Sequence, residues 1–264
     1  MPLVAVELPA QVICSVMGVP DDMRGQVVRW ADEIFSRQRT EDGPERALAA
    51  IQNVMQYALE LRDASRGATN DNMLGELAEA ERAGVKITDG QFMQLFMSLL
   101  IAGFETTHTL IGQSLRMVLE DPDVAAQARA AQANGQIREL VEEFLRYITP
   151  AMHMARHATR DVELHGTRIR KGDMVLLWHV SANRDASVFD DPHRFDSLRK
   201  RNTHQSFGGG GPHFCIGNHL ARLEVQILYR ELLSRDLKIT LNGRPERGWS
   251  VFIDQLLSLP VVCE

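Results

Sequence analysis

The sequence predicts a mainly α-helical protein with small β-sheets near its carboxyl end. Apolar residues recur at helical spacing through most of the chain, and short clusters of Gly, Pro and polar residues interrupt that pattern. Alternation typical of strands appears only in the last hundred or so residues. No repeat or linker divides the 264 residues, so we expect a single domain over 1–264.

The first part of the chain is expected to form short helices followed by one long helix. The short helices cover roughly Pro9–Met17, Asp22–Phe35, Glu45–Arg66 and Asp71–Ala83. Thr88 and Gln91 then have the spacing of a capping box, which satisfies free N–H groups at a helix start. The long helix should run to about Glu120, a length of about 45 Å at 1.5 Å per residue. Its first half is apolar nearly all round, as in a buried central helix.

The second part mixes helices and strands. Further helices are expected over about Val124–Ala131, Gln136–Tyr147 and Gly217–Ser234. Strands are expected within Val162–Ile169, around a turn at His165 and Gly166, over Met174–Trp178, and in a late hairpin formed by Leu237–Leu241 before Asn242 and Gly243.

Composition and charge exclude several classes of function. The chain is 44% hydrophobic with a net charge of −6, which argues against a nucleic-acid partner. The longest apolar run, Phe92–Phe104, is interrupted by polar residues and is too short to span a bilayer. No signal peptide is evident, and the three cysteines are too few and too far apart for a disulfide framework. We expect a cytoplasmic protein without a membrane partner.

The most specific feature is the run from Phe207 to Gly217, which reads FGGGGPHFCIG and precedes a helix. Four consecutive glycines allow the backbone to approach a flat ligand closely. A cysteine at the start of a helix has its thiolate favoured by the helix dipole and free N–H groups, so Cys215 is a candidate metal ligand. Taken alone, the motif also describes a glycine-rich turn with a buried structural cysteine.

In its context this run resembles the cysteine loop of the cytochrome P450 family, Phe-Gly-x-Gly-x-His/Arg-x-Cys-x-Gly. Counted from the cysteine, the matching residues are Gly209, Gly211, His213, Cys215 and Gly217. Phe207 lies eight residues before Cys215 where the family has seven, so the loop holds one extra residue. The resemblance implies that these residues and Phe207 bind heme b, with the Cys215 thiolate as axial ligand of the iron.

A second match to the family involves Glu143 and Arg146, which form its Glu-x-x-Arg motif on a helix. Side chains three apart share a helix face and can pair. By itself such a pair is commonly a surface ion pair of little energetic value. In the family the pair meets an arginine from a Pro-x-Arg-Phe segment, and Arg194 stands at that position. The resemblance gives all three a structural role in holding the cysteine loop.

A third match lies in the long helix, where the run from Ala102 to Thr107 resembles the family's Ala/Gly-Gly-x-Asp/Glu-Thr. Because Thr106 can compete for backbone hydrogen bonds, a distorted turn holding water is expected there. The resemblance implies that Ala102 and Gly103 lie against the heme and that Thr106 and Glu105 deliver protons. The competing interpretation is that the small residues permit close helix packing and that Glu105 pairs with an arginine.

Smaller matches follow the family's order along the chain. The resemblance assigns Arg156 and His213 to the two heme propionates. The runs Ala182–Asp185 and Phe189–Pro192 match the region before the cysteine loop.

The match begins where the family's middle begins, so the resemblance implies a cytochrome P450 fold lacking its N-terminal third, either as a fragment or as a shortened relative. It implies a heme-thiolate monooxygenase that hydroxylates an apolar small molecule (a steroid, terpenoid or lipid) with O₂. No flavin or dinucleotide motif is present, so the electrons would come from a ferredoxin and its ferredoxin reductase. Lys200, Arg201 and Arg222 form either a basic patch for that ferredoxin or a solvated charge cluster.

Two other interpretations remain open at this point. One is a catalytically inactive relic that serves as a helical heme-binding or interaction protein. Exposed apolar surface would then drive its self-association. The other is a small zinc site built from His213, Cys215, His219 and His204, which lacks a second cysteine nearby and leaves the glycine run unused.

Overall fold

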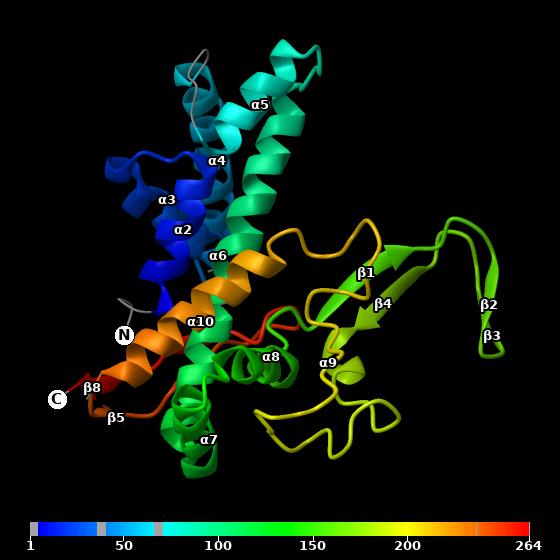
Figure 1. Cartoon of the computed structure of the whole chain (residues 1–264). Coiled ribbons are helices and arrows are strands. Elements are labelled where there is room, and N and C mark those ends of the chain that lie inside the picture. Colours follow the sequence, from blue (N-terminus) through cyan, green and yellow to red (C-terminus); the bar gives the residue numbers. More distant parts are fainter. Residues whose placement is uncertain (1–4, 36–40, 66–70, 236, 264) are drawn as a thin grey trace. The chain divides into compact units, whose positions relative to one another are not determined.

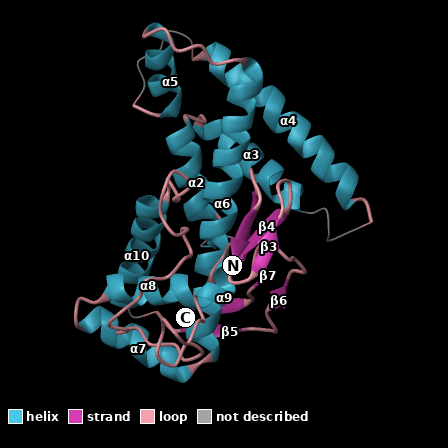
Figure 2. Cartoon of the chain, turned by 90° about the vertical axis from the view of Figure 1, so that its right-hand side faces the viewer, coloured by secondary structure: helices cyan, strands magenta, loops and turns pink. Residues whose placement is uncertain are grey.

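The computed structural model describes residues 5–35, 41–65, 71–235 and 237–263 (Figure 1). The helices are α2 (Glu7–Met17), α3 (Asp21–Ile34), α4 (Gly43–Ala64), α5 (Met73–Arg82), α6 (Asp89–Glu120), α7 (Pro122–Ala133), α8 (Ile137–Ile148), α9 (His179–Ala182) and α10 (Asn218–Ser234). The strands are β1 (His153–His157), β2 (Val162–Leu164), β3 (Thr167–Ile169), β4 (Met174–Trp178), β5 (Ile239–Leu241), β6 (Glu246–Arg247), β7 (Leu256–Ser258) and β8 (Val261–Cys263). Helices dominate and the sheets are small, which confirms the predicted fold class (Figure 2).

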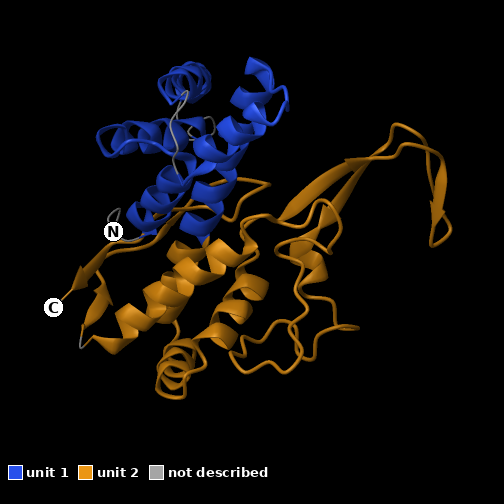
Figure 3. Cartoon of the chain, turned by 45° about the horizontal axis from the view of Figure 1, so that its top comes forward, with its two compact units in different colours: residues 1–109 blue, residues 110–264 orange. Residues whose placement is uncertain are grey.

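The chain divides into two compact units, residues 1–109 and residues 110–264 (Figure 3). Helix α6 begins in unit 1 and ends in unit 2. The single domain expected over 1–264 stays a prediction.

Unit 1 is a helical unit with one apolar core. Helices α3 and α4 pack against each other, and α2 contacts α3 and α5. The aromatic centre of the core is formed by Phe92, Phe96 and Phe104 of α6, all buried. The capping box is confirmed, because the Thr88 N–H donates to Gln91 Oε1 at 3.0 Å and the Gln91 N–H donates to Thr88 Oγ1 at 3.3 Å. The expected end of the α4 helix at Arg66 lies outside the described residues.

Helix α6 is long and apolar enough, at a mean hydropathy of 1.3 over its most apolar stretch, to cross a membrane by length and composition. Half of that stretch is buried inside the protein. The burial agrees with the prediction of a central core helix. The run Phe92–Phe104, on which the exclusion of a bilayer span rested, covers only part of a 32-residue helix.

Unit 2 is built around α8, which packs against α7 and α10. Phe144 of α8 stacks on Tyr229 of α10 with ring centroids 5.2 Å apart, and its ring lies 5.1 Å from that of Phe195. The Asp121 side chain accepts N–H bonds from Asp123 and Val124 and so caps the start of α7. These contacts make the face of α8 that carries Glu143 and Arg146 a buried one.

A two-stranded antiparallel ribbon, β1 with β4, extends away from the helices of unit 2 and continues into the β2–β3 hairpin (Figure 1). The hairpin turns at His165 and Gly166, both with positive φ, as predicted. Strand β1 was not anticipated. Large apolar side chains of β4 are exposed, Met174 at 61% and Trp178 at 46%.

The predicted late hairpin is wrong, because the strand within Leu237–Leu241 does not pair with the segment directly after it. Strand β5 does pair, but with β8, and the β6–β7 pair lies between them along the chain. The Asn242 N–H donates to the Pro260 carbonyl, so the chain leaves Gly243 toward β6 instead of turning back at once. The strand was recognisable from its own residues, whereas its partner is set by a contact about twenty residues away.

Candidate functional site

The cysteine loop closes on itself at its base. The Cys215 N–H donates to the Phe207 carbonyl at 3.0 Å, and turns are closed by Gly208 N–H to Gln205 O and by Phe214 N–H to Gly211 O. The residue that exceeds the family spacing is therefore taken up in the tip, between the two residues of the closing bond. Phe207 lies opposite the cysteine backbone, joined to it by this hydrogen bond.

Most glycines of the loop tip have backbone conformations that favour glycine. Gly208, Gly210 and Gly211 have φ of 88°, 98° and 74°, which side chains rarely tolerate. A Cβ on Gly209 would come within 2.9 Å of the Gln205 amide oxygen. Gly217 lies at the other end, where a Cβ would lie 4.0 Å from Cys215 Sγ. Gly217 thus adds no side chain beside the sulfur.

The Cys215 thiol is half-buried, and burial raises its pKa. A hydrogen bond from the Gly217 backbone and the charge of Arg222 act in the opposite direction without cancelling burial. The backbone N–H at the start of the helix therefore favours the thiolate as expected, while burial has the larger effect on the pKa of Cys215. The donor set still fits a metal-bound thiolate: one soft sulfur with the N–H of Gly217 directed at it and no side chain on that glycine. Binding a metal would displace the thiol proton.

Glu143 and Arg146 form a fully buried ion pair, as the motif predicted. Arg146 Nε and Nη2 donate to the two carboxylate oxygens at 2.8 and 2.7 Å. The remaining guanidinium donors reach the carbonyls of Asn183, Pro192 and Arg194 at 2.8 to 3.1 Å. The pair thus ties helix α8 to the segment that leads into the cysteine loop.

The expected third partner, Arg194, is replaced by Arg199. Arg199 Nε lies 3.2 and 3.3 Å from the two oxygens of Glu143, and its side chain is 8% exposed. The Arg194 side chain is 69% exposed and lies 3.7 Å from Asp196. Only its backbone carbonyl joins the network, because the turn in which Arg194 N–H bonds to Asp191 O directs the side chain outward.

Asn183 connects this network to the cysteine loop. Its amide nitrogen donates to Thr149 Oγ1 at 2.8 Å and Ser206 Oγ at 2.9 Å, and its oxygen accepts the Gln205 N–H at 2.6 Å. Ser206 in turn donates to the Leu145 carbonyl. Asn183 is completely buried. The start of the loop is therefore fixed to the carboxyl end of α8 through the side chains of Asn183 and Ser206.

The motif of the long helix lies in unit 1. Thr106 Oγ1 donates to the Ala102 carbonyl at 2.6 Å, as expected for a threonine that competes for backbone bonds. Helix α6 is nevertheless continuous from Asp89 to Glu120, without the expected distorted turn. Glu105 is buried, and its carboxylate lies 3.8 Å from His108 Nδ1. The His108 ring stacks on Phe104.

Gly103 has a packing role inside unit 1. A Cβ there would come within 2.5 Å of Ile13 Cδ1 of helix α2, so only glycine permits this approach. This contact supports the close-packing interpretation for Gly103, whereas Ala102 is exposed. The contact of Gly103 with the heme stays a prediction.

The two residues assigned to propionates lie apart from these networks. Arg156, on β1, is half-buried and its guanidinium donates to the Ala155 carbonyl at 2.8 Å. His213 is exposed on the cysteine loop. In the described part of the chain, no group of three or more His, Cys, Asp or Glu side chains could hold a metal ion. The proposed zinc set of Cys215 with His204, His213 and His219 is therefore not assembled.

Arg222 does not belong to a free basic patch with Lys200 and Arg201. Its guanidinium is paired with Glu142 at 2.6 and 3.0 Å. Sequence reasoning missed Glu142, Asn183 and Arg199. It also missed Asn202, whose side-chain nitrogen donates to Glu143 Oε2 at 3.0 Å. Asn183 lies in the recognised run Ala182–Asp185, and Arg199 follows the recognised Pro-x-Arg-Phe segment closely, so proximity to a motif was the available signal.

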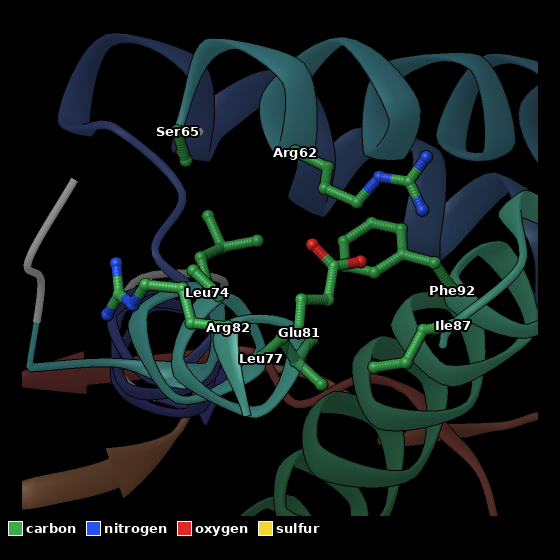
Figure 4. A pocket seen from close by; sticks show the side chains of 9 residues that line it. Arg62, Ser65, Leu74, Leu77, Glu81, Arg82, Ile87 and Phe92 are labelled. Carbon is green, nitrogen blue, oxygen red and sulfur yellow. The ribbon is translucent and has the colours of Figure 1, made fainter. Parts of the chain in front are cut away.

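A separate cavity of about 330 Å³ lies in unit 1 between α4, α5 and the start of α6 (Figure 4). Its lining combines apolar side chains with the charges of Arg62, Glu81 and Arg82. Arg62 is engaged by Asp89 at 2.6 Å and lies over the Phe92 ring. The cavity lining includes one hydroxyl side chain, that of Ser65. Among the described residues no acidic or basic side chain pairs with it, so we assign no chemistry to this cavity.

Comparison with known proteins agrees with the loop and the buried ion pair. The family model for cytochrome P450 matches residues 27–240. The chain belongs to the cytochrome P450 family. It is similar to methyl-branched lipid omega-hydroxylase of Mycobacterium tuberculosis, at 34% identity over 256 residues, which are 96% of this chain and 60% of the relative. Steroid C26-monooxygenase of Mycolicibacterium smegmatis is 32% identical over 249 residues, 93% of this chain and 57% of the relative.

Solved structures show the same fold. P450BioI in complex with an acyl carrier protein carrying hexadec-9Z-enoic acid superimposes with a TM-score of 0.87 at 33% identity, covering 99% of this chain and 68% of that one. CYP109E1 from Bacillus megaterium in complex with corticosterone gives 0.86 at 31% identity, covering 98% and 71%. The chain spans about 60% of the length of the curated relatives it matches. The cytochrome P450 fold is confirmed over that portion.

Proposed function

We propose that the protein is a heme-thiolate monooxygenase, or the part of one that carries the proximal ligand, acting on an apolar lipid or steroid. The observation that carries the proposal is the cysteine loop: a half-buried thiol accepts an N–H from Gly217 at the end of a glycine-rich loop, and a buried ion-pair network holds the segment that leads into that loop. When bound, a thiolate-ligated heme activates O₂ and supplies one oxygen atom to a C–H bond of the substrate.

The chain's own residues then have distinct tasks. Cys215, once deprotonated, would hold the iron of heme b, and Phe207 and the loop glycines would lie against the bound group. Arg156 and His213 are suited by charge and hydrogen-bonding capacity to hold propionates. Glu105 and Thr106 provide a carboxylate and a hydroxyl on one helix, chemistry suited to moving protons toward bound oxygen. Glu143 and Arg146, with Arg199, hold the loop.

The substrate class rests on the relatives. Two of them are named for hydroxylation of a methyl-branched lipid and of a steroid, and one solved relative holds corticosterone. We infer an apolar small molecule of that kind, with a ferredoxin and ferredoxin reductase as electron donors. Since Arg222 is engaged by Glu142, a ferredoxin contact would fall to the exposed Lys200 and Arg201. A cytoplasmic location accords with the soluble type of bacterial relative.

The decisive experiment is the absorption spectrum of the purified protein after reconstitution with heme, reduction and addition of carbon monoxide. A thiolate-ligated heme gives a red-shifted band, and the Cys215→Ser variant should lose it. Cys263→Ser, at an exposed cysteine, is the matched control and should keep it. Retention of the band in Cys215→Ser would overturn the proposal.

An interaction protein is the second candidate, and one observation favours it. Apolar side chains of the β1–β4 ribbon, including Met154, Leu177 and Trp178, are exposed, and such surfaces commonly contact other proteins. Sedimentation of the protein with and without heme separates the candidates. Self-association without any heme uptake would favour this second function.

A further inference from the structure

A second ion-pair cluster lies beside the cysteine loop in unit 2. Glu142 of α8 accepts hydrogen bonds from Arg222 Nε at 2.6 Å and Nη2 at 3.0 Å, and it lies 2.9 Å from His204 Nε2. The His204 side chain is only 3% exposed. Burial alone would raise the pKa of Glu142, but the hydrogen bonds from His204 and Arg222 outweigh it and lower the pKa to about 2. The carboxylate is therefore ionised, and its bond to Arg222 is a charge-assisted, two-point contact.

Arg222 carries this contact onward to the cysteine. Its Nη1 donates to Asn218 Oδ1 at 2.8 Å, and the Asn218 amide nitrogen donates to the Cys215 carbonyl at 2.8 Å. Because an amide has one acceptor and one donor end, the guanidinium determines which end faces the cysteine. Asn218 is itself buried, so water cannot easily replace either contact.

The same guanidinium also covers the opposite side of the loop. Its carbon lies 4.4 Å from the centre of the Phe207 ring, within the range of a cation–π contact. The Phe207 carbonyl accepts the Cys215 N–H. The N–H of Cys215 therefore bonds to Phe207 and its carbonyl to Asn218, and the Arg222 guanidinium contacts both of these residues. Glu142 orients that guanidinium.

We propose that Glu142 is a positioning residue for the Cys215 sulfur, acting through Arg222 and Asn218. The proposal deepens the proposed function and rests on it for the identity of the metal centre, while the placement of the sulfur is a property of this chain alone. Removing the charge of Glu142 would release the guanidinium, and the Asn218 amide and the Phe207 ring would lose a common support.

The test compares Glu142→Gln with Glu139→Gln, an exposed position on the same helix. The readout is the rate at which iodoacetamide alkylates each cysteine of the heme-free protein, followed peptide by peptide. Loss of one charge-assisted bond predicts an increase of about tenfold in the Cys215 rate for Glu142→Gln and none for Glu139→Gln. Exposed Cys263 and buried Cys14 serve as internal references and should not change.

Asn218→Ala leaves the Glu142 to Arg222 pair in place and should raise the Cys215 rate to a similar extent. The double variant should add little, because both changes break one chain of contacts. Equal Cys215 rates in Glu142→Gln and Glu139→Gln, rates that multiply in the double variant, or a parallel rise at Cys14 would each overturn the proposal.

After heme reconstitution, Glu142→Gln should also lower the fraction of the red-shifted carbon monoxide band relative to Glu139→Gln. If the unaltered protein takes up no heme, the proposed function fails, yet the alkylation rates still decide whether Glu142 positions the sulfur.

Discussion

Arg146 grips the Glu143 carboxylate through two parallel hydrogen bonds of 2.7 and 2.8 Å, and both side chains are fully buried. Every remaining guanidinium donor pairs with a backbone carbonyl between residues 183 and 194. Removing the charge of Glu143 would leave the buried Arg146 guanidinium without its carboxylate, a cost of about 3–5 kcal/mol for buried pairs. The strength of this pair comes from complete satisfaction of its hydrogen bonds, which a surface pair lacks.

Arg199 and not Arg194 should carry the third charge of this network. We expect Arg199→Met to lower the free energy of unfolding by about 2–4 kcal/mol, since Glu143 then loses a buried cationic partner. Arg194→Met, the matched control at an exposed position, should change it by no more than about 0.5 kcal/mol. Urea denaturation followed by circular dichroism measures both. The reverse order of effects would contradict the assignment.

Asn183 should contribute nearly as much to the free energy of unfolding as a charged residue of the network. Asn183→Ala leaves Thr149, Ser206 and the Gln205 N–H without their partner, and we expect a loss of about 3 kcal/mol. Asn134→Ala, at the exposed end of α7, is the control and should have little effect. Thermal unfolding of the two variants is the comparison. An unchanged midpoint for Asn183→Ala would show that the loop start has other support.

Gly103 is expected to tolerate no side chain while Ile13 is present. Gly103→Ala should destabilise by about 1–3 kcal/mol through overpacking. Gly90→Ala, where an added Cβ meets open space in the same helix, should stabilise by about 0.5–1 kcal/mol. Combining Gly103→Ala with Ile13→Ala should cost less than the sum of the two single changes, as measured by denaturant midpoints. Additive costs would rule out direct contact as the cause.

Glu224 should make stability fall as the pH rises. Its side chain is buried, Oε2 has no hydrogen-bond partner among the described residues, and burial raises its pKa from 4.5 to about 7. The folded state therefore binds the proton more tightly. This contribution is fully present below about pH 4.5 and is lost as the pH passes through about 7, to a total of about 3 kcal/mol.

Glu224→Gln should remove that slope, and melting temperatures measured between pH 5 and 8 test it. Glu231→Gln, exposed on the same helix, is the control and should keep the slope of the unaltered protein. A slope that persists in Glu224→Gln would assign the pH dependence to another group.

Much of the fold could be read from local signals. The capping box at Thr88 and Gln91 fixed the start of the long helix, because the hydrogen bonds concerned lie within four residues. The positive-φ turn at His165 and Gly166 was equally local. The pairing of β5 with β8 was not, since nothing in Leu237–Leu241 specifies which distant strand it meets.

The site divides in the same way. Cys215, Glu143 and Arg146 follow from motifs of fixed spacing. The choice of Arg199 over Arg194 depends on how the turn at Asp191 directs two nearby arginines, which periodicity does not encode. The contact of Glu142 with Arg222 joins residues 80 positions apart, so no window along the sequence contains it.

The closing bond from the Cys215 N–H to the Phe207 carbonyl makes the stem and the tip of the cysteine loop separable. A glycine added to or deleted from the tip changes the path of the chain between Phe207 and Cys215, and the hydrogen bond between these two residues stays in place. Loop length is accordingly a variable that evolution or an engineer can adjust here to reshape the ligand's surroundings, while the sulfur stays in register with the helix behind it.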